Sequence, residues 1–84
     1  MPDDGDGLVP ALLRSIVRAM VERPEEVQVK VRAAEDVTTL AIHVHPEDIR
    51  RILDRQGNNL LALRTVIRGA GIKRKREYKV TIAR

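Results

Sequence analysis

PEDIRRILDRQGNNLLALRTVI, residues 46–67, contains two segments with helical apolar spacing and a short polar break between them. Pro46 suits the first position of a helix, because an N–H there would have no intrahelical partner. Apolar residues then recur on one face until Gly57 interrupts the pattern. Asn58 is a favourable N-cap for the segment that follows. The sequence therefore predicts a helix, a four-residue break and a second helix.

Both predicted helices carry arginines away from their apolar faces. In the first helix Arg50 and Arg51 lie off the apolar stripe, and in the second Arg64 and Arg68 lie one turn apart. Two short helices that meet at a basic, glycine-containing turn can present backbone N–H groups to a phosphate. The stretch is therefore a candidate anion-binding site.

Residues 52–60 resemble the core of a K-homology (KH) RNA-binding domain. That family's pattern is a short apolar helix, a G-x-x-G loop and a longer helix with an apolar residue three positions after the second glycine. The similarity is greatest to small bacterial single-domain KH proteins of the KhpA type, which carry P-E-D, then Q-G, then A-L-R-T-V. This chain has these residues at 46–48, 56–57 and 62–66. Asp54 stands where the family has the first loop glycine, so the loop reads D-R-Q-G.

The segment before this stretch predicts one helix and a hairpin. Residues 8–22 place apolar side chains at helical spacing, and Pro24 ends the helix. Residues 27–32 and 40–45 alternate apolar with polar side chains, so each predicts a strand with one buried face. The connection between them is short, which favours an antiparallel pair.

After the central stretch, Gly69 and Gly71 are expected to end the second helix. Residues 73–76, Lys-Arg-Lys-Arg, are then expected to form a solvated loop, and residues 78–82 a last strand. The order is α-β-β-α-α-β, which predicts an α+β fold with a three-stranded sheet and helices packed on one face. This is the order of the type II KH fold, which the resemblance implies for residues 8–84.

Composition limits the remaining possibilities. Eighty-four residues allow one domain, with a core that must be aliphatic because Phe and Trp are absent. The chain has no cysteine, which fits a reducing cytoplasm and excludes disulfides and thiolate metal sites. No apolar run reaches the roughly 18 residues that a membrane span needs. Residues 1–7 are acidic, which is unlike a signal peptide, and predict a disordered tail before a single domain at 8–84.

Charge is distributed unevenly along this basic protein. The net charge is +4, but residues 1–26 hold three basic and six acidic groups, whereas residues 27–84 hold thirteen basic and six acidic groups. The basic part contains both central helices. A polyanion is the natural partner for such a surface, although a basic balance also keeps many small proteins soluble.

Catalytic and metal chemistry have little support in the sequence. His43 and His45 are two apart on a predicted strand and would point the same way, but two ligands are too few for a structural zinc site. Ser15 has no histidine near it in sequence, and no phosphate-binding or dinucleotide motif is present. We therefore expect no enzyme activity, no cofactor and no metal.

The KH resemblance implies that the loop clamps about four nucleotides of single-stranded RNA, with its backbone close to their phosphates. Bases would lie between the helix at 46–53 and one edge of the sheet. A carboxylate at Asp54 would repel a phosphate by about 1 kcal/mol at 4 Å in high dielectric, less in salt. The residues expected to contact RNA are Ile49, Arg50, Arg51, Ile52, Asp54, Arg55, Gln56, Gly57, Asn58, Leu60 and Arg64.

Several functions remain open at this point. The resemblance implies a post-transcriptional regulator or RNA chaperone that forms a homodimer, or a heterodimer with a larger KH-containing protein. One alternative is a protein-interaction module with weakened RNA binding. Another is a DNA-binding helix-turn-helix, because residues 46–68 also fit two helices and a glycine turn. The strands predicted on either side favour the KH domain.

Overall fold

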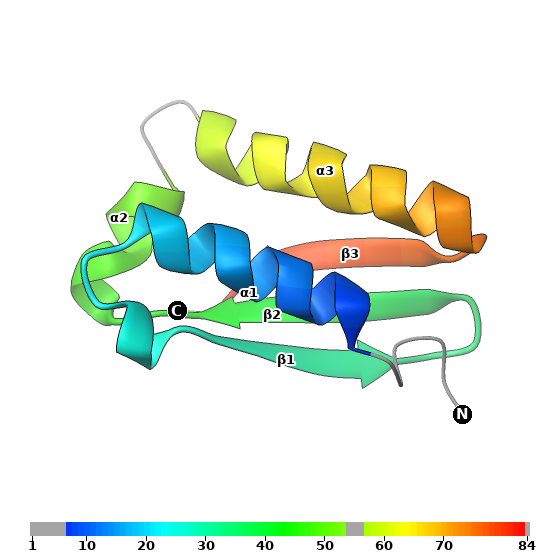
Figure 1. Cartoon of the computed structure of the whole chain (residues 1–84), viewed down its shortest axis with the longest axis horizontal. Helices are drawn as coiled ribbons and strands as arrows, with labels where there is room; N and C mark the ends of the chain where they lie inside the picture. The colour runs from blue at the N-terminus through cyan, green and yellow to red at the C-terminus, as the bar shows by residue number, and fades with distance from the viewer. Residues whose placement is uncertain (1–6, 54–56, 84) are drawn as a thin grey trace.

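The computed structural model describes residues 7–53 and 57–83 of the chain, and Figure 1 shows their arrangement. The predicted order α-β-β-α-α-β is confirmed. Short 3₁₀ turns, η2 (Pro24–Glu26) and η3 (Pro46–Asp48), precede β1 and α2. The helices and strands are α1 (Leu8–Met20), β1 (Gln28–Ala33), β2 (Val37–His43), α2 (Ile49–Ile52), α3 (Asn58–Arg74) and β3 (Glu77–Ile82).

The three strands form one mixed sheet in the order β1-β2-β3. β1 and β2 pair antiparallel as a hairpin, as predicted, whereas β2 and β3 run parallel. A parallel pair needs a long crossover, which α2 and α3 supply. Val31, Leu40 and Val80 lie in one row across the sheet and therefore on one face. β3 is an edge strand whose outer side runs beside α3.

The helices cover one face of the sheet, as predicted (Figure 1). α1 packs against β1 and α3 packs against β3. Alternate residues of β2 and β3 are enclosed beneath the helices. The predicted buried face of residues 27–32 is only partly confirmed, because Val27 is buried but Val31 is 46% exposed. The core is aliphatic apart from Tyr78, which is 8% exposed. Its completely buried hydrophobic side chains are Leu13, Val17, Leu40, Ile42, Ile52 and Ile67. Within the described residues, no helix has the length and apolar character to cross a membrane.

The predicted end of the second central helix was wrong. α3 continues through Gly69 and Gly71 to Arg74, and Lys75 ends it in the left-handed conformation at φ 57°. Gly71 has a different role, because a Cβ atom there would lie 2.4 Å from the Arg76 carbonyl oxygen. The same atom would lie 2.8 Å from Cδ2 of Tyr78. Gly71 is therefore required for the close approach of α3 to β3, and it does not end the helix.

The prediction of a solvated loop at residues 73–76 was also wrong, because the first two of them belong to α3. Arg76 extends across the sheet to the β1–β2 turn. Its Nη2 donates to the Ala34 carbonyl at 2.7 Å, its Nη1 to the Glu35 carbonyl at 3.3 Å, and its Nε to Oγ1 of Thr38. Thr38 is completely buried, so Arg76 satisfies a polar group inside the fold.

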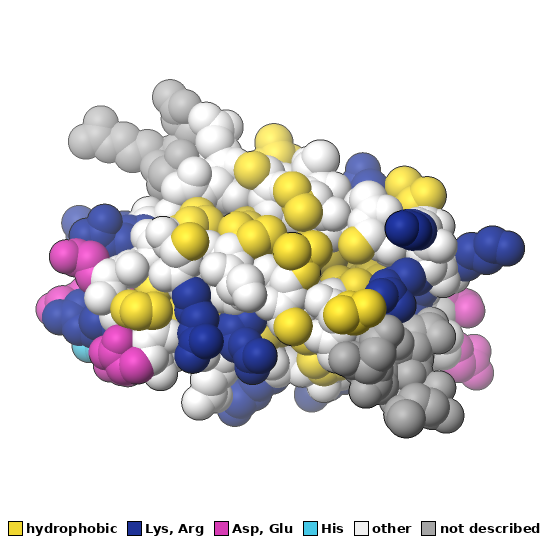
Figure 2. Space-filling model, viewed as in Figure 1, with side chains coloured by type: hydrophobic (Ala, Val, Ile, Leu, Met, Phe, Trp, Pro, Cys, Tyr) yellow, Lys and Arg dark blue, Asp and Glu magenta, His cyan; other side chains and the backbone are white. Residues whose placement is uncertain are grey.

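The outer face of the two long helices is partly apolar. Figure 2 shows hydrophobic side chains gathered across this face, with cations around them. On α1, Leu8 is 58% exposed and Leu12 is 41% exposed, although helical spacing had placed Leu12 on the apolar stripe. On α3, Leu61, Val66 and Ile72 are exposed. The core therefore does not use all of the apolar surface of the helices.

Candidate nucleic-acid interface

The turn into α3 centres on Gly57, because three of the four predicted loop residues, Asp54, Arg55 and Gln56, lie outside the described residues. Gly57 adopts the left-handed conformation, with φ 72° and ψ 13°, and is itself the N-cap of α3. The prediction that Asn58 would be the N-cap was wrong by one residue, because α3 begins at Asn58. Within the described residues, a Cβ atom on Gly57 would meet nothing within 4 Å, so no described atom blocks the approach to this turn.

The apolar residues expected at the interface divide into core and surface. Ile52 is completely buried and Leu60 is 8% exposed, and both belong to the central core cluster. Their side chains therefore hold α2 and α3 in place, and a ligand would not reach Ile52. Ile49 is partly exposed. The first turn of α3 is tied to α2 by Asn59, whose Nδ2 donates to the Arg51 carbonyl at 2.6 Å.

Arg51 has a structural role that the sequence did not indicate, because Arg51 lies off the apolar face of the predicted helix. Its guanidinium pairs with Glu22 and donates from Nε to Oδ1 of Asp48 at 3.2 Å. The hydrogen bond and charge of Glu22 raise the pKa of Arg51 above its usual value. Arg50 is exposed beside Pro46, with no ion pair or hydrogen bond within the described residues. Arg50 is therefore the less constrained of the two arginines.

Asp48 links the segment that follows α1 to the start of α2. Its carboxylate is 1% exposed and accepts the backbone N–H groups of Glu22 at 3.2 Å and Arg23 at 3.1 Å. Burial on its own would raise the pKa of Asp48. The two backbone hydrogen bonds, with the charges of Arg51 and Arg23, outweigh burial and lower that pKa below 3.8. Residues 46–53 therefore form a 3₁₀ turn and a four-residue helix around this carboxylate, where one continuous helix was predicted.

The two histidines do not share a strand, which corrects the predicted pair. β2 ends at His43, and His45 is the N-cap of η3. The Nδ1 atom of His45 accepts the backbone N–H of Glu47 at 3.0 Å. No group of three or more His, Cys, Asp or Glu residues within the described ranges could hold a metal ion.

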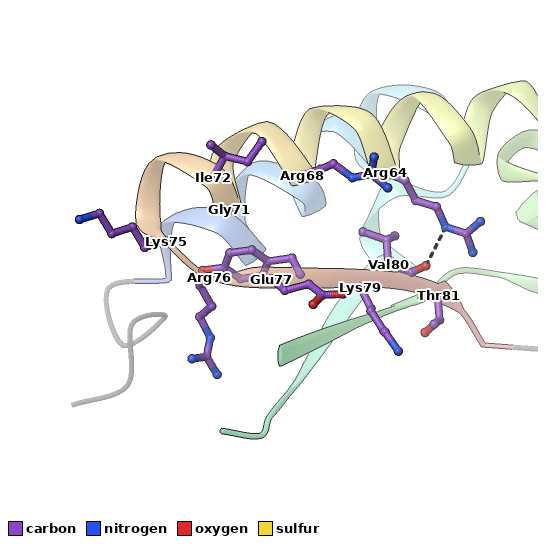
Figure 3. Close-up of a pocket in the computed structure, with 11 residues that line it drawn as sticks. Arg64, Arg68, Gly71, Ile72, Lys75, Arg76, Glu77, Lys79, Val80 and Thr81 are labelled. Carbon is purple, nitrogen blue, oxygen red and sulfur yellow. Dashed lines mark hydrogen bonds between the residues drawn. The ribbon is translucent and has the colours of Figure 1, made fainter. Parts of the chain in front are cut away.

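A groove with a volume of about 750 Å³ lies between α3 and β3 (Figure 3). This differs from the predicted position beside residues 46–53, although the predicted sheet edge does form one wall. Arg64 and Arg68 extend from α3, and Lys79 comes from β3. The Nε of Arg64 donates to the Val80 carbonyl at 3.1 Å, which fixes that side chain across the groove. Lys75 adds a further cation at the end of α3.

The lining of this groove combines charge with apolar surface. Gly71, Ile72, Tyr78 and Val80 supply apolar area, and Glu77 is the one carboxylate that lines it. Cations along an apolar floor suit a ligand that has both phosphates and flat, weakly polar bases. Of the residues expected to bind, the structure brings Arg64 to this groove.

Sequence reasoning missed Arg68, Lys75 and Lys79 as candidate site residues. The one-turn spacing of Arg64 and Arg68 was visible in the sequence, and it places both on one side of α3. Nothing in the sequence showed that β3 would lie beside that side of the helix. The contribution of Lys79 therefore required the parallel placement of β3 next to β2.

Comparison with known proteins gives consistent matches. The family described as KhpA/KhpB, KH domain, matches residues 10–82. The RNA-binding protein KhpA of Clostridium acetobutylicum is 37% identical over 71 residues, which cover 84% of this chain and 95% of that protein. The KhpA proteins of Mycobacterium tuberculosis and Streptomyces coelicolor are each 36% identical, over 67% and 70% of this chain and 70% and 75% of their own lengths.

Proposed function

The chain belongs to the KhpA/KhpB KH-domain family, and on that basis we propose that it binds single-stranded RNA along the groove between α3 and β3. The family is one of RNA-binding proteins and not of enzymes. The match covers residues 10–82 and favours neither a helix-turn-helix DNA-binding domain nor a module that binds only proteins. The relatives named above are themselves called RNA-binding proteins.

The observation that carries the proposal is the row of cations along the groove. From Gly57 at the start of α3, Arg64 and Arg68 follow at about 10 and 16 Å along the helix axis, given a rise of about 1.5 Å per residue. Lys75 comes after them at the far end of the helix. A strand of nucleic acid placed along α3 would therefore meet a positive charge at intervals over its whole length.

The β3 side of the groove offers backbone hydrogen-bonding groups and apolar surface to the bases. β3 is the edge of the sheet, so its outer backbone groups are not paired with another strand. Arg64 occupies the Val80 carbonyl, and the apolar part of the groove floor lies beside it. Bases splayed from a single strand can lie on this floor and bond to the strand edge, whereas a duplex keeps its bases stacked inside.

Binding that depends mainly on phosphates and a strand edge discriminates weakly among sequences. We therefore assign the protein the general role of a post-transcriptional regulator or RNA chaperone in the cytoplasm. Asp54 adds a negative charge shortly before α3 in the sequence, which favours modest affinity.

The same proposal includes a second KH-containing protein chain as partner, either another copy of this chain or a larger relative. The exposed apolar side chains on α1 and α3 support it, because soluble monomers rarely leave such surface uncovered. Val66 is 48% exposed on α3 and Thr65 beside it is exposed and polar. If the partner is another copy, light scattering should show a dimer for the wild type and for Thr65→Glu, and a monomer for Val66→Glu. A monomeric wild type would favour the larger relative as partner.

RNA binding is tested by fluorescence anisotropy with short single-stranded RNA and two matched double variants. Arg64→Gln with Arg68→Gln removes two cations one turn apart in the groove. Arg14→Gln with Arg18→Gln removes two exposed cations one turn apart on α1. The groove variant should bind at least tenfold more weakly at low salt, and its slope of log K against log salt should fall by about 1.4, at about 0.7 per phosphate contact.

At about 0.1 M salt the α1 variant should keep most of the wild-type affinity, because long-range charge alone is screened over about 10 Å at that ionic strength. Equal losses in both variants would mean that net charge, and not the groove, determines binding. No measurable binding of single-stranded RNA by the wild type would reject the proposed function.

A further inference from the structure

Among residues 7–53 and 57–83, no helix covers the opposite face of the sheet, and this open face carries three cations. Strand residues alternate in direction, so Lys30 and Arg32 on β1 and Lys79 on β3 point away from the side that buries Leu40. All three cations are exposed. Among the strand residues of this face, Glu77 is the only carboxylate. The open face is therefore basic.

In the part of the chain that the structure describes, the side chains of these three cations do not hold other parts of the fold in place. Arg51 pairs with acidic side chains, and Arg76 bonds to backbone carbonyls and a buried hydroxyl. Within the described residues, by contrast, the side chains of Lys30, Arg32 and Lys79 make no hydrogen bond or ion pair. Their charges are therefore available to an anionic ligand.

The register of the sheet places the three cations on either side of Thr39 and Ala41 in the central strand. Arg32, Thr39 and Lys79 lie in one row across the three strands, so the two cations are about 9.5 Å apart between Cα atoms, at about 4.8 Å per strand. Lys30 lies two residues from Arg32, about 6.6 Å along β1. The central strand presents only Thr39 and Ala41 between them, which leaves room for a chain to pass.

The open face is continuous with the groove. Lys79 and Thr81 line the groove at its β3 wall, and Figure 3 shows both side chains directed away from α3. A strand that leaves the groove over the edge of β3 would therefore meet Lys79 first and then Arg32 and Lys30 beyond it.

We propose that the open face of the sheet is a second RNA-contact surface, over which a strand held in the groove continues from Lys79 to Arg32 and Lys30. This inference rests on the proposed function and extends its binding site. The face has no aromatic side chain on which a base could stack, because the single aromatic residue, Tyr78, points to the core. It therefore contacts phosphates and sugars, and it adds length and salt dependence without adding sequence preference.

The test compares two single-stranded RNAs, one of about four nucleotides, the length that a KH loop clamps, and one roughly three times longer. Lys30→Gln with Arg32→Gln removes the two cations of β1, and Arg14→Gln with Arg18→Gln removes two from α1. Wild-type protein should bind the longer RNA more tightly. The β1 variant should lose several-fold affinity for the longer RNA, and its salt slope should fall by about 1.4. Its affinity for the short RNA should not change.

Circular dichroism of each variant confirms folding, and these exposed positions make unfolding an unexpected result. Equal losses in the β1 and α1 variants, or equal losses on both RNA lengths, would overturn the second surface. If wild type binds the short RNA and gains nothing from added length, this inference fails and the groove stands. If it binds neither RNA, the proposed function fails together with this inference.

Discussion

Gly71 lies where α3 packs tightly against β3. A larger residue there should therefore destabilise the fold, whereas the same change at Gly69 on the same helix should not. A Cβ atom at Gly71 would overlap the Arg76 carbonyl and the Tyr78 ring, whereas one at Gly69 would meet nothing within 4 Å. Gly71→Ala should therefore cost about 1–3 kcal/mol of unfolding free energy through overpacking. Gly69→Ala should gain up to about 1 kcal/mol. Denaturant melts of both variants check this, and equal effects would contradict the close approach.

Asp48 makes a prediction about pH. Its folded-state pKa lies below 3.8, so the ionised carboxylate stabilises the fold at pH values above the unfolded pKa. That contribution is lost as the pH falls through the folded pKa. Asp48→Asn should therefore be less stable than wild type at pH 7, and the difference should shrink below about pH 3.8. Asp36→Asn, at an exposed turn residue, is the control and should follow the wild type at each pH. A difference that is constant with pH would rule out this role.

Asp54 makes a prediction about affinity, although its position lies outside the described residues. Asp54→Gly should strengthen binding of single-stranded RNA several-fold, because about 1 kcal/mol of repulsion is worth less than a factor of ten. The gain should shrink at high salt. Asp54→Asn removes the charge and keeps the side chain, so anisotropy titrations of both variants separate repulsion from space. Unchanged or weaker binding by a folded glycine variant would mean that Asp54 does not limit the loop.

At the scale of elements, Arg76 joins the start of β3 to the β1–β2 turn. Arg76→Gln should release the turn carbonyls and leave the buried Thr38 hydroxyl without its cation, at a cost of about 1–3 kcal/mol. Hydrogen exchange should accelerate at the Ala34 N–H, which bonds to the Val37 carbonyl at 2.8 Å. Lys73→Gln, at an exposed position of α3, should change neither quantity. Unaltered exchange in the Arg76 variant would show that the turn holds without this contact.

Elements with a clear apolar period were predictable, because the period reflects a single buried face. The alternation of β2 and β3 correctly identified Leu40, Ile42 and Val80 as core residues. The end of α3 was not predictable from Gly71. Glycine is required there by the close contact with β3 and not by a change in the local backbone conformation. The hydrogen bonds that Asp48 accepts from the segment after α1 were equally hidden, because their donors, Glu22 and Arg23, lie 26 and 25 residues away in sequence.

The candidate site was partly predictable for the same reason. The KH-like segment led to the turn at Gly57 and to Arg64, both of which local sequence can indicate. Arg51, which was expected to contact RNA, forms an ion pair with Glu22 that depends on the packing of α1 and that local sequence did not indicate. Lys79 joined the groove only because β3 lies parallel to β2. Interactions between charged residues of different elements could therefore be identified only from the folded structure.

At the scale of the whole molecule, the basic groups concentrate where the groove and the open sheet face lie. Residues 27–84 contain all of α2, α3 and the sheet, and they hold thirteen basic against six acidic groups. Arg64, Arg68 and Lys75 run along one side of this unit and Lys79 marks its edge. A single strand can lie along this row of cations, whereas a duplex cannot place its bases against β3.

The salt dependence of binding to single-stranded RNA, measured beside duplex DNA of the same length, tests the central claim most directly. The account predicts tighter binding to the single strand, with log K falling linearly against log salt at a slope of roughly 0.7 for each of a few phosphate contacts. Equal affinity for duplex DNA and single-stranded RNA, or an RNA affinity that does not respond to salt, would contradict it.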